Sequence, residues 1–314
     1  MKNRFLTIGA TMAAVALALT GCGGKTAGPT TGGEGGGSIS SGMIFGGPPE
    51  FKTRTDGIPG LKRVYNVEFG QYKVTDVGGP VTVNALKRGQ VDAADLFTTD
   101  PSISANGFVV LEDDQHMFAA QNIVPIIAKD KVTDGVKTVL NGIQAKLTTD
   151  GLIEMNSKVS NEKQDPAAVA KAWLADNGLD ASGTSAKGVS LTVGSANFPE
   201  NVILAEIYAG ALEAQGATIE KKLNIGSREK YYPALKAGSL DLFPEYTGTI
   251  LTYIDKTSDA TTPDDVYAAL AKALPSNLIA LDKAEAQNSD AVVVAKETAD
   301  KFKLKTIADL AEKG

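Results

Sequence analysis

The stretch LKAGSLDLFPEYTGT, from Leu235 to Thr249, carries the clearest structural signal in this chain. Its pattern predicts the end of a helix, a stop at Gly238, a short strand over Leu240–Phe243 and then a polar turn with one aromatic residue, Tyr246. In open α/β sheets, ligands bind beside the carboxyl ends of the strands. We therefore expect a binding site at the turn that follows this strand.

A weaker copy of this stretch, LKRGQVDAADLFTTD, runs from Leu86 to Asp100. The two copies share Leu-Lys-x-Gly-x-(Val/Leu)-Asp and begin 149 positions apart. The same offset carries the apolar run Met43–Gly47 close to Leu191–Ser195. Matched spacing at both ends predicts two βαβαβ units of equal length, each ending in a polar turn. Chance similarity between two amphipathic helix–strand junctions is the alternative.

Composition limits the classes of function. The chain has 314 residues, enough for about two domains, and 43% of them are hydrophobic, which suffices for sizeable cores. The net charge is −6. Nucleic-acid binding requires a basic face, so we expect no nucleic-acid partner.

The amino terminus reads as a targeting segment. Lys2 and Arg4 precede an apolar run, Phe5–Leu19, that is too short for a membrane span. The run ends in Leu-Thr-Gly-Cys, and Cys22 is the only cysteine, so no disulfide can form within the chain. This ending resembles the lipobox of bacterial lipoproteins, which implies cleavage before Cys22 and a diacylglycerol on its thiol. An ordinary secretory peptide with a stray cysteine is the alternative.

We therefore expect residues 1–21 to be a lipoprotein signal peptide. Residues 22–40 are rich in glycine, threonine and serine and are expected to form a flexible tether. The folded part is then held at the cell membrane by its lipid anchor, on the extracytoplasmic face (cell surface or periplasm).

Hydrophobic periodicity and end signals predict the other elements. Pro48-Pro49-Glu50 suits a helix start, and residues 50–61 are expected to form a loop. Trp173 is expected to pack on the buried face of a helix, and a short helix is expected over Lys305–Gly314. Strands are expected at Phe69–Thr75, Val91–Phe97, Phe108–Leu111, Asn122–Ala128, Val189–Gly194, Ile219–Leu223, Leu278–Leu281 and Ala291–Ala295. Helices are expected at Pro80–Lys87, Thr133–Leu147, Asp150–Val159, Ala167–Asn177, Pro199–Gln215, after a Ser227 cap, and from a Thr262 cap to about Leu274.

Catalytic and metal chemistry lack their usual side chains. His116 is the only histidine, and Cys22 is assigned to the lipid. Nucleophile-elbow, Walker and dinucleotide-binding motifs do not stand between a strand and a helix here. Zinc sites draw on cysteine and histidine, and the paired aspartates at 113–114 and 264–265 read as surface and cap groups. We expect no enzyme, no cofactor and no metal.

A two-lobed α/β body whose polar turns face each other is typical of a solute-binding protein.

Four motifs carry a family resemblance. They are EFKTRTDGIPGLKRVY from Glu50, GGPVTVNALKRGQVDAADLFTTD from Gly78, GSANFPENVILAEIYAGALEAQG from Gly194 and IGSREKYYPALKAGSLDLFPEYTGT from Ile225. The chain resembles the substrate-binding proteins of ABC importers for glycine betaine, choline and related osmoprotectants. The resemblance covers nearly all of the chain beyond the tether. It implies a two-lobed periplasmic-binding-protein-like α/β fold (type II) with the ligand cleft between the lobes.

The order of the two halves departs from the family. There, the half with SANFPEN precedes the half with EFKTR, whereas here it follows it. This looks like a circular permutation, which is tolerated when the original termini lie close together. One lobe is then residues 41–121 plus 288–314, and the other is 122–287, with an exposed linker of few contacts at 179–188. The C-terminus should lie beside Met43–Gly47. A shuffled or misassembled gene is the alternative.

The resemblance also assigns candidate ligand residues. In the family, tyrosines surround a quaternary ammonium through cation–π attraction, and a basic or polar group pairs with a carboxylate where the ligand has one. Tyr246 matches a cage tyrosine and Arg54 the carboxylate partner. Phe97, Gln121 and Asp290 stand where the family often has aromatic residues, so the cage looks depleted. The remaining candidates are Thr55, Asn197, Phe198 and Thr247. For Phe97 the alternative is a core aromatic, and for Arg54 it is a salt bridge with Asp56.

The expected function is therefore capture of a small osmoprotectant, such as glycine betaine, choline or a related quaternary amine, and its delivery to an ABC transporter permease. A monomer is expected. A receptor for another small cationic or amino-acid-like solute is the alternative among binding proteins. A surface enzyme and a purely structural surface protein are more distant alternatives.

Overall fold

The computed structural model describes residues 37–314. The predicted signal peptide, Cys22 and the tether up to residue 36 lie outside the described residues.

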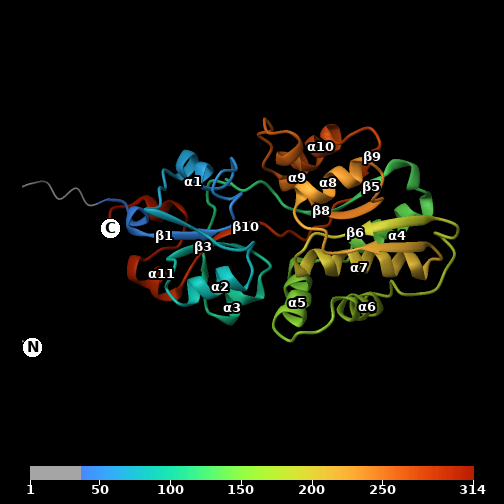
Figure 1. Ribbon diagram of the computed structural model, residues 1–314, viewed down its shortest axis with the longest axis horizontal. Helices are drawn as coiled ribbons and strands as arrows, with labels where there is room; N and C mark the ends of the chain where they lie inside the picture. The colour runs from blue at the N-terminus through green and yellow to red at the C-terminus, as the bar shows by residue number, and fades with distance from the viewer. Residues whose placement is uncertain (1–36) are drawn as a thin grey trace, which may run out of the picture. The chain divides into compact units, whose positions relative to one another are not determined.

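The strands form two five-stranded mixed sheets (Figure 1). The first sheet contains β1 (Ile44–Gly47), β2 (Gln71–Val74), β3 (Ala93–Phe97), β4 (Val109–Val110) and β10 (Asp290–Val294). The second contains β5 (Ile123–Ala128), β6 (Ser190–Gly194), β7 (Thr218–Lys222), β8 (Leu242–Tyr246) and β9 (Leu278–Ala280).

The two sheets share one topology. Their orders are β2-β1-β3-β10-β4 and β7-β6-β8-β5-β9. In each, the first three strands are parallel, and the fourth runs antiparallel to both of its neighbours. We call the two sheets with their helices the first lobe and the second lobe. The predicted two-lobed α/β fold is confirmed.

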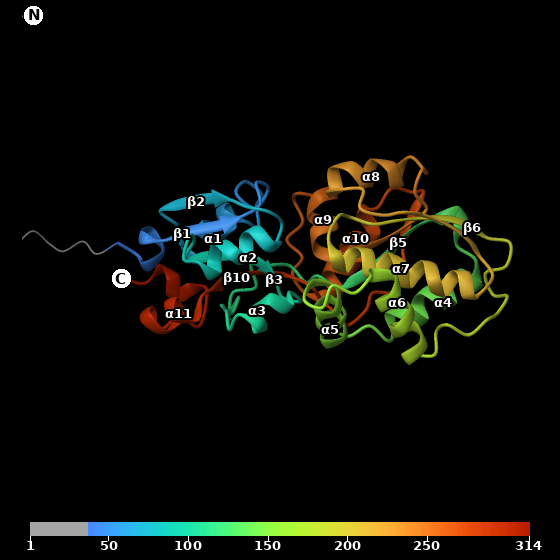
Figure 2. The same cartoon turned by 60° about the horizontal axis from the view of Figure 1, so that its bottom comes forward.

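Helices cover both faces of each sheet (Figures 1 and 2). Those of the first lobe are α1 (Ile58–Tyr65), α2 (Pro80–Lys87), α3 (Pro101–Ala105) and α11 (Lys296–Phe302). Those of the second lobe are α4 (Asp134–Gln144), α5 (Thr149–Ser160), α6 (Pro166–Asp176), α7 (Pro199–Ala214), α8 (Arg228–Lys236), α9 (Thr247–Ile254) and α10 (Pro263–Ala273). Short 3₁₀ turns lie at Ile39–Gly42, Lys129–Lys131 and Ala308–Ala311. Trp173 of α6 packs against the core formed with α4, α5 and α7.

The predicted internal repeat is confirmed. The chain passes through β1-α1-β2-α2-β3 in the first lobe and through β6-α7-β7-α8-β8 in the second. The offset of 149 carries β3, which begins at Ala93, onto β8, which begins at Leu242. Phe97 and Tyr246 therefore end equivalent strands.

The predicted polar turn after Phe243 is wrong. The strand continues to Tyr246, which pairs with Ile123, and Thr247 begins α9 directly. Pro244 is tolerated inside this strand because β6 pairs with β8 only at Leu242, so the missing N–H breaks no ladder there.

Three other local predictions are also wrong. Pro48 and Pro49 lie before a series of turns and not in a helix, and the segment expected as a loop ends in α1, which begins at Ile58. The expected C-terminal helix is only a 3₁₀ turn, Ala308–Ala311, and the helix of this region is α11. By contrast, the helix expected after Ser227 is confirmed as α8, with Ser227 at its N-cap position, although the Ser227 side chain makes no capping hydrogen bond.

The described chain ends lie side by side. Ser38 forms an antiparallel bridge with Lys313, and the Ile39 amide donates to the Glu312 carbonyl at 2.8 Å. The Gly314 amide donates to the Gly37 carbonyl at 3.2 Å. The C-terminus thus lies next to the segment that leads into β1, which is the proximity that an exchanged order of the halves requires.

The linker at 179–188 is mostly exposed, as predicted. The prediction that it makes few contacts is wrong. Ala186 is fully buried in the second lobe. The Gly183 amide donates to the Ala214 carbonyl at 2.8 Å, and the Gln215 side chain donates to the Ala181 carbonyl at 2.8 Å. The linker is therefore fixed to the end of α7.

Candidate ligand-binding site

Three predicted aromatic residues meet in one row. Phe97 ends β3, Tyr246 ends β8, and Phe198 is the residue just before α7. The ring centroids of Phe97 and Phe198 are 6.1 Å apart and their planes differ by 26°. Those of Phe198 and Tyr246 are 6.0 Å apart and differ by 34°. The row therefore joins the end of a strand of the first sheet to that of a strand of the second.

A buried carboxylate that the sequence analysis missed anchors this row. Glu200, at the start of α7, is 3% exposed. Its Oε1 accepts hydrogen bonds from the Tyr246 hydroxyl at 2.9 Å and from Asn288 Nδ2 at 2.8 Å. Its Oε2 accepts from Thr99 Oγ1 at 2.6 Å and from Asn156 Nδ2 at 2.7 Å. Burial, followed by the negative charge of Glu200, raises the pKa of Tyr246 well above its ordinary value, so this hydroxyl stays a donor.

The sequence shows an acidic residue, Glu200, at the start of a predicted helix, but it does not show that four side chains donate hydrogen bonds to it. An acidic residue in the first turn of a helix favours the helix dipole, and that explanation would have sufficed from the sequence alone. Its partners Thr99, Asn156 and Asn288 come from three distant segments, and only the fold shows that they converge.

Arg54 does not hold a free guanidinium. Its Nε lies 2.8 Å from Asp56, which was the predicted alternative partner, and its Nη2 lies 2.5 Å from Asp290, which was not predicted as a partner. Burial alone would lower the pKa of Arg54, but the carboxylates of Asp290, Asp56 and Asp95 raise it above its ordinary value. The fork that would bind a ligand carboxylate is occupied by the chain's own acids.

Asp95 adds a further buried carboxyl to this cluster. It is 2% exposed, and Asp95 Oδ1 has no hydrogen-bond partner among the described residues. Burial first, and then the charge of Asp290, raise the pKa of Asp95 well above its ordinary value, because a buried anion beside a second anion is unfavourable.

Gln121 and Thr247 form hydrogen bonds with the backbone. Gln121 Oε1 accepts from the Thr249 amide at 2.9 Å. Thr247 Oγ1 accepts from the Asn122 amide at 3.1 Å and donates to the Ala120 carbonyl at 3.0 Å. Both side chains therefore tie the start of α9 to the segment that enters β5.

The other two candidates lie at the surface. Thr55 and Asn197 are exposed, and within residues 37–314 neither side chain makes a hydrogen bond. Asn197 directly precedes Phe198, whereas Thr55 directly follows Arg54.

Glu245, which directly precedes Tyr246 in the sequence, forms an ion pair with Arg228 that fixes the end of β8. Glu245 is fully buried and accepts from Arg228 at 3.1 Å (Nε to Oε1) and 2.9 Å (Nη2 to Oε2), a two-point contact. The Tyr231 hydroxyl donates to the same carboxylate at 2.9 Å. These bonds fix the end of β8 and, with it, the position of the Tyr246 ring.

The two segments that connect the lobes are bonded to each other. Asn122 and Gln287 form an antiparallel bridge, and the Asn288 amide donates to the Gln121 carbonyl at 3.1 Å. Asn288 also donates to Glu200, so this connecting ribbon and the aromatic row share one hydrogen-bond network.

The family follows from a comparison with known proteins. A family model described as the substrate binding domain of ABC-type glycine betaine transport systems matches residues 39–176 and 189–314. The chain belongs to this family. The predicted resemblance is confirmed, and the family is one of substrate-binding domains of transport systems rather than of enzymes. The exchanged order of its halves stays a prediction.

Curated relatives align with part of the chain only. The glycine-betaine-binding protein of Pseudomonas aeruginosa is 27% identical over 149 residues, 47% of this chain and 48% of that protein. The carnitine transport binding protein OpuCC of Listeria monocytogenes is 26% identical over 125 residues, 39% of this chain and 40% of that protein. The chain thus spans less than half the length of these relatives. Among solved structures, PhnD1 of Prochlorococcus marinus with methylphosphonate is 13% identical, with a TM-score of 0.43, covering 87% of this chain and 83% of that one.

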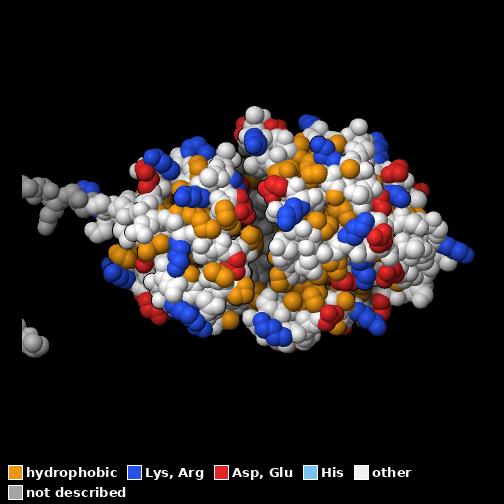
Figure 3. All heavy atoms as spheres, viewed as in Figure 1, with side chains coloured by type: hydrophobic (Ala, Val, Ile, Leu, Met, Phe, Trp, Pro, Cys, Tyr) orange, Lys and Arg blue, Asp and Glu red, His pale blue; other side chains and the backbone are white. Residues whose placement is uncertain are grey.

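Neither a metal-binding cluster nor a membrane-spanning helix is found among the described residues. From residue 37 onward, no cluster of His, Cys, Asp and Glu is arranged to hold a metal ion. Over the same range, no helix combines the length and apolar character that a membrane crossing needs. On the face shown in Figure 3, basic and acidic side chains are interspersed.

Proposed function

We propose that this chain is a lipid-anchored receptor on the extracytoplasmic side of the membrane, which captures a small quaternary amine and delivers it to an ABC transporter permease. The family supports transport of glycine betaine-like solutes. The anchor rests on Cys22 and the apolar run before it. We propose that the receptor acts as a monomer.

One observation carries the choice of a cation. The aromatic row of Phe97, Phe198 and Tyr246 is backed by the buried carboxylate of Glu200. Aromatic faces attract a quaternary ammonium with about 0.5–2 kcal/mol each, depending on desolvation. A nearby buried anion adds to the negative potential that such a ligand requires.

The Arg54 cluster narrows the class of ligand further. Because Asp56 and Asp290 already occupy its guanidinium, a ligand carboxylate would have to displace one of them. This favours a cation without a carboxylate, such as choline, over glycine betaine or carnitine. A receptor for an amino-acid-like solute, the alternative, would need Arg54 to be released.

Calorimetry with choline, glycine betaine, carnitine and a set of amino acids tests the proposal. We expect choline to bind most tightly. Phe198→Leu, which keeps an apolar side chain without a π-face, should weaken choline roughly 2- to 30-fold. Phe302→Leu, a change of the same kind in α11, should leave the affinity unchanged. Tight binding of an amino acid, or choline binding that Phe198→Leu does not affect, would reject the proposal.

A further inference from the structure

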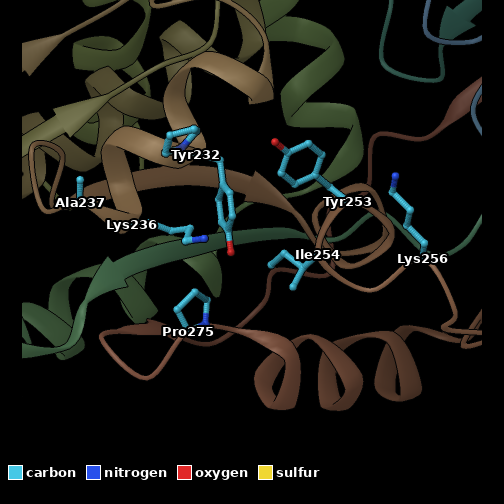
Figure 4. A pocket seen from close by; sticks show the side chains of 8 residues that line it. Tyr232, Lys236, Ala237, Tyr253, Ile254, Lys256 and Pro275 are labelled. Atoms are coloured by element: carbon cyan, nitrogen blue, oxygen red, sulfur yellow. The ribbon is translucent and has the colours of Figure 1, made fainter.

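A pocket on the second lobe is lined by none of the candidate ligand residues. It has a volume of about 750 Å³ and lies between α8, the end of α9 and the segment after α10 (Figure 4). Its main lining residues are Tyr232, Lys236, Tyr253, Ile254, Lys256 and Pro275.

The Tyr232 hydroxyl is the feature that points to a ligand. Tyr232 is 6% exposed, and within residues 37–314 its buried hydroxyl has no hydrogen-bond partner. The large majority of buried polar groups in native proteins are paired. Figure 4 shows the hydroxyl directed into the pocket, between Lys236 and Ile254. Burial, with Glu245 and Tyr253 nearby, raises the pKa of Tyr232 to about 12, so the hydroxyl is a donor at neutral pH.

A cation lies over the ring of Tyr232. Lys236 Nζ is 5.7 Å from the centroid of the Tyr232 ring, and Figure 4 shows the ammonium close to the hydroxyl end of that ring. Lys256 stands at the rim with its ammonium turned away. Across the described residues, no ion pair involves either lysine. Lysines near helix C-termini stabilise the helix dipole, which accounts for their position. It does not account for the unpaired hydroxyl.

We propose that this pocket binds a small organic oxyanion, that is, a carboxylate or phosphate group on a short apolar body. The Tyr232 hydroxyl and the Lys236 ammonium donate to the anion. The edge of Tyr253, with Ile254 and Pro275, forms the apolar wall. The volume lies within the range of about 300–1,000 Å³ that is usual for small-ligand pockets. This ligand is opposite in charge to the cation of the proposed function, so the two sites are separable by experiment.

Amide NMR titrations of the full-length chain test this site, with phenyl phosphate and benzoate as the probes and benzyl alcohol as the uncharged control. We expect saturable shifts at residues 232–237 and 253–256 with at least one of the two anions. Tyr232→Phe and Lys236→Gln should each weaken binding roughly tenfold or more, because each removes a hydrogen bond to a charged group. Tyr267→Phe, whose hydroxyl donates to the Leu281 carbonyl outside the pocket, should leave the affinity unchanged.

Tyr232→Phe removes a hydroxyl without a partner, so its melting temperature should equal that of the parent chain and its binding can be read directly. Saturation by phenyl phosphate alone or by benzoate alone would support the site and identify the oxyanion. The proposal is overturned if neither anion saturates, if benzyl alcohol produces the same shifts, or if Tyr232→Phe binds as tightly as the parent.

Discussion

Glu200→Gln is the sharpest probe of the candidate ligand-binding site. The change keeps the shape of the side chain but replaces one acceptor oxygen with an amide that donates. Glu200 accepts two hydrogen bonds on each oxygen, so two donors lose their acceptor whichever way the new amide turns. A hydroxyl, from Thr99 or Tyr246, can rotate to accept instead. The other donor is the side-chain NH₂ group of Asn156 or Asn288, and it then faces the NH₂ group of the new glutamine.

The expected cost follows from this count. Hydrogen bonds to a charged group contribute about 1.5–3 kcal/mol each, and a buried donor left unpaired costs about 1–3 kcal/mol. One such bond is lost outright and the others weaken as the charge disappears, so Glu200→Gln should lower the free energy of unfolding by about 2–4 kcal/mol. Glu200→Ala removes the acceptor of all four donors and should cost about 4 kcal/mol or more, partly offset by water that enters.

Urea unfolding of the parent and both variants measures these differences. Glu213→Gln is the matched control because Glu213 is an exposed glutamate on the same helix, α7. It should change the free energy of unfolding by less than about 0.5 kcal/mol, as is usual for surface substitutions. Choline affinity should fall in Glu200→Gln and not in Glu213→Gln, since Glu200 accepts a hydrogen bond from Tyr246 and Glu213 does not contact the aromatic row. If Glu200→Gln is as stable as Glu213→Gln, the four-donor network is refuted.

Three further predictions concern other features. Because the pKa of Asp95 is raised in the folded state, its stabilising contribution is complete below about pH 4 and is lost as pH rises through the raised pKa. In urea unfolding, the parent should therefore lose stability relative to Asp95→Asn from about pH 4 upward. Stability curves that stay parallel over this pH range would contradict the prediction. The exchanged order of the halves can be reversed in a variant. This variant begins at residue 189, passes from Gly314 through a short linker into Gly37, and ends at residue 176. Its melting temperature should lie within a few degrees of that of the parent, and failure to fold would reject the exchanged order. Cys22→Ala should release the protein from membranes or block its processing, and normal processing with membrane fractionation would disprove the lipid anchor.

The sequence predicted the repeat and most elements because each rests on a local signal. Gly238, which takes a positive φ of 73°, ends α8 as expected, and the matching spacing carried β3 onto β8. The polar turn after Phe243 was wrong because the backbone pairing of Tyr246 with Ile123 is a contact between segments that are far apart in the chain. Local pattern contains no information on that pairing.

The aromatic row was predicted from the sequence, whereas the charged groups around it were not; binding of a ligand by these residues stays a prediction. Phe97, Phe198 and Tyr246 were found because motifs name them. Glu200 and the pairing of Arg54 with Asp290 were missed because both depend on which acids and amides converge from other segments. Asp290, which pairs with Arg54, is 236 positions further along the chain.

The position of β10 has a consequence for how the protein is made. This inner strand lies between β3 and β4, yet it is translated after the entire second lobe. A chain that is still growing, or one cut before Asp290, has all five strands of the second sheet but leaves open the edge of β3 that β10 later covers. An uncovered strand edge is a template for pairing with other chains. Premature termination close to the 3′ end of the message should therefore yield aggregation-prone product, and a chaperone that shields β3 until release would prevent this.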